Sequence, residues 1–132
     1  MEIDYVRPDG MHVNPAFTQA LILPAAARLM LIGGQNAVDG DGTIVGKGDI
    51  GAQAAKAIDN LIRCLAARGL GLEHLVKMTI YLAAGQDLRP AFGAWMARWG
   101  NRTNPPIVTG FFVAGLANPD YLIEIEGTAL LP

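Results

Sequence analysis

The chain has 132 residues, of which 52% are hydrophobic and 17% are charged, and its formal net charge is −2. Soluble domains average about 25% charged residues, so this apolar composition excludes an intrinsically disordered chain. The length is that of one compact domain, which we place at residues 1–132. The ten basic residues form no basic stripe, so the sequence favours no nucleic-acid partner.

The number of cysteines and the length of the apolar runs indicate the cellular compartment that we expect. A single cysteine, Cys64, excludes an intramolecular disulfide and a CxxC zinc site. Residues 1–10 carry charges of both signs and lack the start of a signal peptide. The apolar runs stop short of the roughly 20 residues that a membrane helix needs. We therefore expect a cytoplasmic protein with no membrane partner that covers its excess apolar surface by self-association.

The first third of the chain predicts β-structure. Apolar runs at residues 17–23 and 28–32 predict two strands, which the short connection between them favours as a hairpin. A turn cluster at residues 39–42 precedes a short strand predicted at residues 43–45.

Two amphipathic patterns predict helices. Asp49 is a suitable N-cap for a helix that runs from Ile50 until Gly69 and Gly71 stop it. Asp87 precedes a second helix, which ends at residues 100–101. The periodicity assigns the polar residues of the first helix to its solvated face; these are Gln53, Lys56, Asp59, Asn60 and Arg63.

Three further strands complete the order of elements. Residues 75–83 alternate between apolar and polar side chains, and residues 107–114 and 121–131 predict two terminal strands. The order predicts an α/β fold in which two helices cover one face of a single mixed β-sheet.

The last predicted strand carries two carboxylates, Glu124 and Glu126, on one face. This face belongs either to a solvated edge strand, whose charges oppose aggregation, or to a cleft in which a glutamate positions water or accepts a proton. Gly33 and Gly34 indicate either a bulge or a close approach of a ligand to the backbone, and the bulge is the commoner of the two.

Other reactive residues give weaker signals. His12 and His74 lack the spacing of metal ligands, so we predict no metal site. Cys64 lies beside the packed stripe of the first helix, which favours a structural thiol. The chain has no serine, so a Ser-His-Asp hydrolase is excluded. Phe92, Trp95 and Trp99 have the helical spacing of core residues rather than of an aromatic recognition face.

Three motifs in order resemble the RidA/YjgF family of reactive intermediate deaminases, whose members are often labelled endoribonuclease L-PSP. They are GGQ at residues 33–35, the helix and strand at residues 48–82, and LIEIEGTAL at residues 122–130. The resemblance spans residues 17–130. It implies a chorismate-mutase-like fold and a homotrimer with a small-molecule cleft between neighbouring subunits. It also implies hydrolysis of enamines and imines by water without a cofactor.

The resemblance also implies site residues. The glycine that contacts substrate falls on Gly34, and the glutamate that holds water falls on Glu124. The arginine of the family's P-x-R segment, which clamps a substrate carboxylate, falls on Ile107, so the chain resembles an arginine-lacking subgroup. An isoleucine supplies none of the charge-assisted hydrogen bonds of a guanidinium. Whether Arg89 or Arg102 replaces that arginine is left open by the sequence.

Three further substitutions make the implied cleft apolar. The family's tyrosine falls on Phe17, a polar helix position falls on Phe92, and Thr109 replaces a residue that is frequently cysteine. We therefore expect a neutral or aromatic ligand rather than a simple 2-imino acid. The hypotheses are an enamine or imine hydrolase that uses Glu124, a trimer that binds a small molecule or a partner without catalysis, and an endoribonuclease. The last is disfavoured because no basic groove is predicted.

Overall fold

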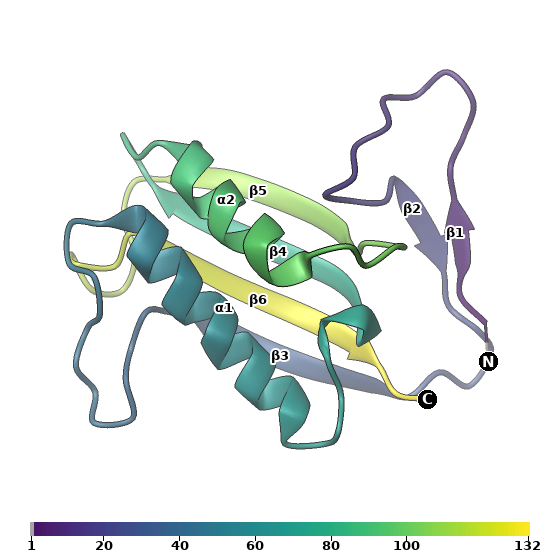
Figure 1. Ribbon diagram of the computed structural model, residues 1–132, viewed down its shortest axis with the longest axis horizontal. Coiled ribbons are helices and arrows are strands. Elements are labelled where there is room, and N and C mark those ends of the chain that lie inside the picture. The colour runs from purple at the N-terminus through teal and green to yellow at the C-terminus, as the bar shows by residue number, and fades with distance from the viewer. Residues whose placement is uncertain (1) are drawn as a thin grey trace.

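Both helices form where the sequence places their caps. The computed structural model describes residues 2–132, and in it α1 spans Ile50–Ala66 and α2 spans Leu88–Trp99 (Figure 1). The Asp49 carboxylate accepts a hydrogen bond from the Ala52 amide at 3.1 Å, and Asp87 accepts one from the Arg89 amide at 3.0 Å. These two bonds satisfy amides that the helix itself cannot.

A mixed four-stranded sheet lies under the helices. Its order is β3 (Leu29–Gln35), β6 (Ile123–Leu130), β4 (Leu75–Ala83) and β5 (Ile107–Val113). Strands β4 and β5 are parallel, whereas β6 is antiparallel to both of its neighbours. Both helices pack on the same face of this sheet (Figure 1), which confirms the predicted fold class.

The predicted N-terminal hairpin is wrong. Strand β2 (Ala20–Ile22) pairs with β1 (Asp4–Val6) in a separate two-stranded sheet, and β3 pairs with β6 instead. The apolar β3 gains more by joining the covered sheet than by pairing with a three-residue strand. The short strand predicted at residues 43–45 is reduced to one bridge between Val38 and Ile44, and a 3-10 turn, η1 (Leu72–His74), precedes β4.

The two faces of the four-stranded sheet differ in what covers them. Side chains such as Met78, Leu82 and Ile125 point toward the helices and are buried in the core. We call the other side the open face; it carries Lys77, Thr79, Tyr81, Thr109, Phe111, Glu124, Glu126, Thr128, Leu29 and Leu31.

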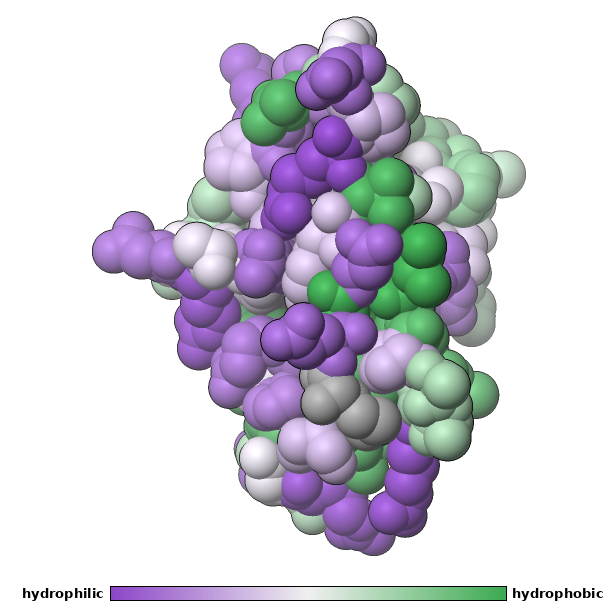
Figure 2. Space-filling view, turned by 90° about the vertical axis from the view of Figure 1, so that its right-hand side faces the viewer, coloured by the Kyte–Doolittle hydropathy of each residue, from purple (hydrophilic) through white to green (hydrophobic). Residues whose placement is uncertain are grey.

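The open face exposes apolar surface in the single chain, and Leu31 is 77% exposed there. Hydrophobic residues also reach the surface at the end of the molecule that carries β1 and β2, where Figure 2 shows a band of them among hydrophilic residues. No helix within residues 2–132 combines the length and the hydropathy that crossing a bilayer requires.

The polar face predicted for α1 is wrong at Gln53. This side chain is fully buried, donates to the carbonyls of Gly46 and Asp120 at 3.2 and 2.9 Å, and accepts from the Leu122 amide at 2.9 Å. These bonds fasten the first turns of α1 to the segment that leads into β6. A buried amide is stable there because its donors and acceptor are satisfied.

Candidate functional site

Glu124 lies on a central strand. Strand β6 is paired along both edges, with β3 on one side and β4 on the other. The alternative that the two glutamates lie on a solvated edge strand is therefore wrong. Glu124 is half-buried on the open face and lies opposite Tyr81 of β4.

An asparagine holds the Glu124 carboxylate. Asn36 donates from Nδ2 to Glu124 Oε1 at 3.1 Å and to the Ile123 carbonyl at 3.2 Å. Asn36 is itself held by Asn60 of α1, whose Nδ2 donates to the carbonyls of Asn36 and Val38 at 3.0 Å each. A path of hydrogen bonds thus links α1 to the carboxylate and fixes its orientation.

Sequence reasoning missed this pair of asparagines. It assigned Asn60 to the solvated face of α1, where the structure has it half-buried, and it did not single out Asn36. The available signal was a polar side chain directly after the strand that ends in Gly33, Gly34 and Gln35. That signal is weak, since asparagine is common wherever a strand ends in a turn.

Gly34 leaves room for Glu124. A Cβ built on Gly34 would collide with Oε2 and Cδ of the Glu124 side chain, whereas one built on Gly33 meets nothing within 4 Å. The pairing of β3 with β6 also shifts register between Ile32 and Gln35. The predicted bulge is therefore present, and it brings the backbone of Gly34 against the carboxylate.

Glu126 has a different partner. The Tyr81 hydroxyl donates to Glu126 Oε1 at 3.0 Å, and this hydrogen bond raises the pKa of Tyr81 above its usual value, as do burial and the charges of both glutamates. Phe111 stacks on Tyr81 with 6.0 Å between ring centroids. Tyr81 therefore stays protonated at neutral pH and occupies one oxygen of Glu126. Glu124 is the carboxylate that the tyrosine leaves free for chemistry.

A shallow pocket of about 220 Å³ lies beside Glu126 on the open face, and Glu124 is not among the residues that line it. Its walls include Leu31, Lys77, Glu126 and Thr128. Residues 2–132 contain no group of three or more His, Cys, Asp or Glu side chains that could hold a metal ion.

Ile107 and Thr109 lie at the far edge of the sheet. Both residues belong to β5 and pair with Lys77 and Thr79 of β4. Strands β4 and β6 separate them from Gly34 in β3. Three strand spacings put the two edges about 14 Å apart. The single chain therefore does not bring these predicted site residues to Gly34.

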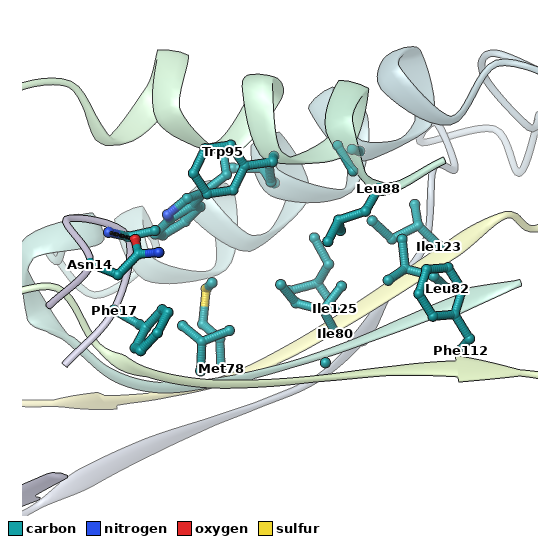
Figure 3. Close-up of a pocket in the computed structure, with 17 residues that line it drawn as sticks. Asn14, Phe17, Met78, Ile80, Leu82, Leu88, Trp95, Phe112, Ile123 and Ile125 are labelled. Carbon is teal, nitrogen blue, oxygen red and sulfur yellow. Dashed lines mark hydrogen bonds between the residues drawn. The ribbon is translucent and has the colours of Figure 1, made fainter. Parts of the chain in front are cut away.

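Phe17 and Phe92 lie on the other side of the sheet. Both line a cavity between α2 and the inner sheet face (Figure 3). Thr18 joins this segment to the start of β5, since its amide donates to the Pro106 carbonyl at 3.0 Å. Phe17 therefore directly precedes Thr18, which is hydrogen-bonded next to Ile107. The sheet nevertheless separates Phe17 and Phe92 from Glu124.

Neither candidate arginine contacts Glu124 within residues 2–132. Arg89 pairs with Asp87, with 2.8 Å between Nη2 and Oδ2. Arg102 pairs with Glu73 at 3.3 Å and donates to the carbonyls of Arg98 and Trp99 at 3.1 and 2.9 Å. Within the part of the chain that the structure describes, neither of these two guanidinium groups takes the place of the arginine that the resemblance puts at Ile107.

A mixed sheet with helices on one face, and a glutamate held against a strand glycine on the other, defines a class of small α/β proteins. Residues 11–131 match the Endoribonuclease L-PSP family. A RutC family protein from Synechocystis is 33% identical over 109 residues, which cover 82% of each chain. The chain therefore belongs to the Endoribonuclease L-PSP family, which includes the Rid and YjgF proteins.

Solved structures share the fold. The Rid family protein YyfB from Yersinia pestis, described as of unknown function, is 27% identical, with a TM-score of 0.86 over 99% of this chain and 100% of that one. The YjgF gene product of E. coli is 25% identical, with a TM-score of 0.70 over 82% and 84% of the two chains. E. coli TdcF, solved with bound serine, has a TM-score of 0.72 at 22% identity over 83% and 85%, which shows the fold alone.

Proposed function

We propose that this protein binds a small neutral molecule in clefts between copies of the chain and hydrolyses it there as an enamine or imine. In the reaction, water adds to the carbon of the C=N bond while Glu124 accepts a proton from that water. Glu124 returns this proton to the nitrogen, which gives a carbinolamine, and then passes the hydroxyl proton of the carbinolamine to the same nitrogen as the C–N bond breaks. An amine or ammonia leaves, and a carbonyl compound remains. No cofactor takes part in this scheme.

The observation that carries the proposal is the way Glu124 is held. Asn36 fixes one carboxylate oxygen at 3.1 Å, and Gly34 leaves space for the other oxygen beside the backbone. A carboxylate with one fixed oxygen can orient water with the second, which is the geometry that general base catalysis requires.

A second copy of the chain completes the cleft. The site residues carried by β3 and β6 lie in one half of the sheet, and those carried by β5 lie at the opposite edge. They converge if the β5 edge of one copy approaches the β3 edge of the next. Such head-to-tail contacts close into a ring when the rotation between copies closes, and form a filament otherwise; we propose a closed ring of three copies.

Ile107 determines the class of substrate. An anionic substrate that enters an apolar wall loses hydration and gains no ion pair in return. A neutral imine, particularly an aromatic one, loses little hydration and gains apolar contact. The substrate is therefore an imine or enamine without a carboxylate next to the reacting carbon.

Replacement of Glu124 by glutamine tests the mechanism. The parent should accelerate hydrolysis of N-benzylidenemethylamine, followed by its ultraviolet absorbance, and should leave 2-iminobutyrate near its spontaneous rate. E124Q should lose about 100-fold of the acceleration, the usual contribution of a general base. The matched control is E126Q, because Glu126 bonds Tyr81 on the same strand face, and it should retain activity.

The same variants separate the non-catalytic alternative. If E124Q binds the imine as the parent does and neither accelerates its hydrolysis, the protein is a binding protein and the mechanism is wrong. Faster hydrolysis of 2-iminobutyrate than of the neutral imine would contradict the role given to Ile107.

RNA cleavage, which the family name suggests, has less support in the charges. The open face carries Glu124 and Glu126 together with Lys77, whereas an RNA surface neutralises several phosphates with clustered cations. Binding to single-stranded RNA that weakens steeply with added salt would revive this function.

A further inference from the structure

The cavity between α2 and the inner sheet face is separate from the Glu124 site. Its volume is about 370 Å³, within the range of small-molecule sites, roughly 300–1,000 Å³. Glu124 lies on the opposite face of β6 from Ile123 and Ile125, which line the cavity (Figure 3). The sheet therefore stands between this cavity and Glu124.

The cavity has a buried floor and an exposed mouth. Ile58, Met78 and Ile123 are almost fully buried, whereas Phe92 and Phe112 are 44% and 57% exposed. None of the lining residues is charged. A molecule can therefore enter between α2 and β5 and bury apolar surface at the floor.

One polar group in this cavity has no partner. Trp95 is only 6% exposed, and its Nε1 is buried without a hydrogen-bond acceptor within residues 2–132. The stacked Trp99 contrasts with it, because its Nε1 donates to the Arg102 carbonyl at 2.9 Å. Buried indole N–H groups are usually paired. Trp95 lines the cavity, so a small rotation of the indole would present this unpaired N–H to an acceptor that a ligand brings.

A second donor lies at the same end. Figure 3 shows the Trp95 indole nitrogen on the side of the cavity where Asn14 lies. Asn14 Oδ1 accepts a hydrogen bond from the Ala16 amide at 2.8 Å, which assigns the oxygen and the nitrogen of this side chain. The NH2 group of Asn14 can then donate to a ligand. The cavity thus combines apolar walls with two neutral donors at one end.

We propose that this cavity binds a neutral aromatic or branched aliphatic molecule through one carbonyl oxygen. The oxygen accepts from Trp95 Nε1, and Asn14 lines the same end of the cavity. A carboxylate is excluded because the lining supplies no cation to offset its loss of hydration. The apolar remainder of the ligand fills the space over Met78 and Ile123.

Indole resonances in nitrogen-15 NMR spectra test this directly. The chain has two tryptophans, so two indole N–H signals are expected, and W95F assigns them. Titration with acetophenone should shift the Trp95 signal downfield and saturate. The Trp99 signal should move much less, because its N–H already has an acceptor. Ethylbenzene, which has the same shape without the oxygen, should bind without the downfield shift.

Two variants separate the hydrogen bond from the space. In W95F the ratio of acetophenone affinity to ethylbenzene affinity should fall about fivefold, which is the effect of losing one hydrogen bond. The ratio is used because the difference in hydration between the two probes is the same for the parent and the variant. Gly110 lines the cavity, and a Cβ there meets only the Ile80 carbonyl at 3.9 Å. G110L should therefore fold, fill the cavity and abolish the saturable response of the Trp95 signal to both probes.

Three results would overturn the proposal. They are an unsaturable titration in the parent, an unchanged response of the Trp95 signal to acetophenone in a folded G110L, and an affinity ratio that W95F leaves untouched. N101D serves as a control, since Asn101 is exposed after α2 and is not among the residues that line the cavity.

Discussion

At the scale of single residues, the position of Glu124 depends on what its neighbours lack as much as on what they carry. Gly34 has no side chain where the carboxylate lies, and Asn36 supplies the donor that holds it. The sequence could indicate Glu124 and Gly34, since paired carboxylates and strand glycines are visible patterns. It could not indicate Asn36, whose role depends on a strand partner 88 positions away.

G34A should displace the carboxylate without unfolding the protein. The colliding atoms are the far end of a flexible side chain, so the free energy of unfolding should fall by less than about 1 kcal/mol, close to that of an ordinary surface change. The rate of imine hydrolysis should also fall, because the Glu124 carboxylate leaves its position beside Asn36. Urea unfolding and the hydrolysis assay measure the two effects.

G33A is the matched control, because a Cβ there meets nothing within 4 Å. It should keep both stability and activity. Equal activity in G33A and G34A would show that the contact between Gly34 and Glu124 does not matter.

At the scale of elements, local signals predicted the helices and failed for strand pairing. The caps Asp49 and Asp87 act within their own first turns, so sequence alone located both helix starts. Strand β3 pairs with β6, about 90 residues later, and no pattern inside residues 17–32 encodes that partner. The hairpin prediction failed because proximity in sequence was taken as proximity in the sheet.

An ion pair between the two helices should make stability depend on pH. Arg98 of α2 donates from Nε and Nη2 to Asp59 of α1 at 2.8 and 3.1 Å, which lowers the pKa of Asp59 below its ordinary 3.8. The folded state therefore holds this carboxylate ionised more firmly than the unfolded chain does. Its contribution is complete above pH 3.8 and is lost as the pH falls through the lower folded value.

The contribution should reach at most about 1 kcal/mol, because the Asp59 side chain is 49% exposed and solvent screens the pair. Urea unfolding of the parent, D59N, R98Q and the double variant at pH 7 and pH 3 measures it. The coupling between the two changes should be present at pH 7 and much smaller at pH 3. Equal coupling at both values would show that the ion pair does not carry the effect.

At the scale of the whole molecule, the single chain does not bring together the residues that the resemblance implies. Gly34 and Glu124 lie on β3 and β6, Ile107 and Thr109 lie on β5 at the opposite edge of the open face, and Phe17 and Phe92 lie behind the sheet. The same face exposes three large apolar side chains, those of Leu29, Leu31 and Phe111. Both observations are explained if the open faces and edges of three copies meet.

Native mass spectrometry of the parent, L31D and N101D tests this claim most directly. Leu31 lies on the open face, whereas Asn101 is exposed after α2 and gains the same charge in its variant. The parent and N101D should have the mass of three chains, and L31D should dissociate toward single chains while remaining folded. A parent that has the mass of one chain would contradict the shared cleft, and with it the function assigned to Glu124.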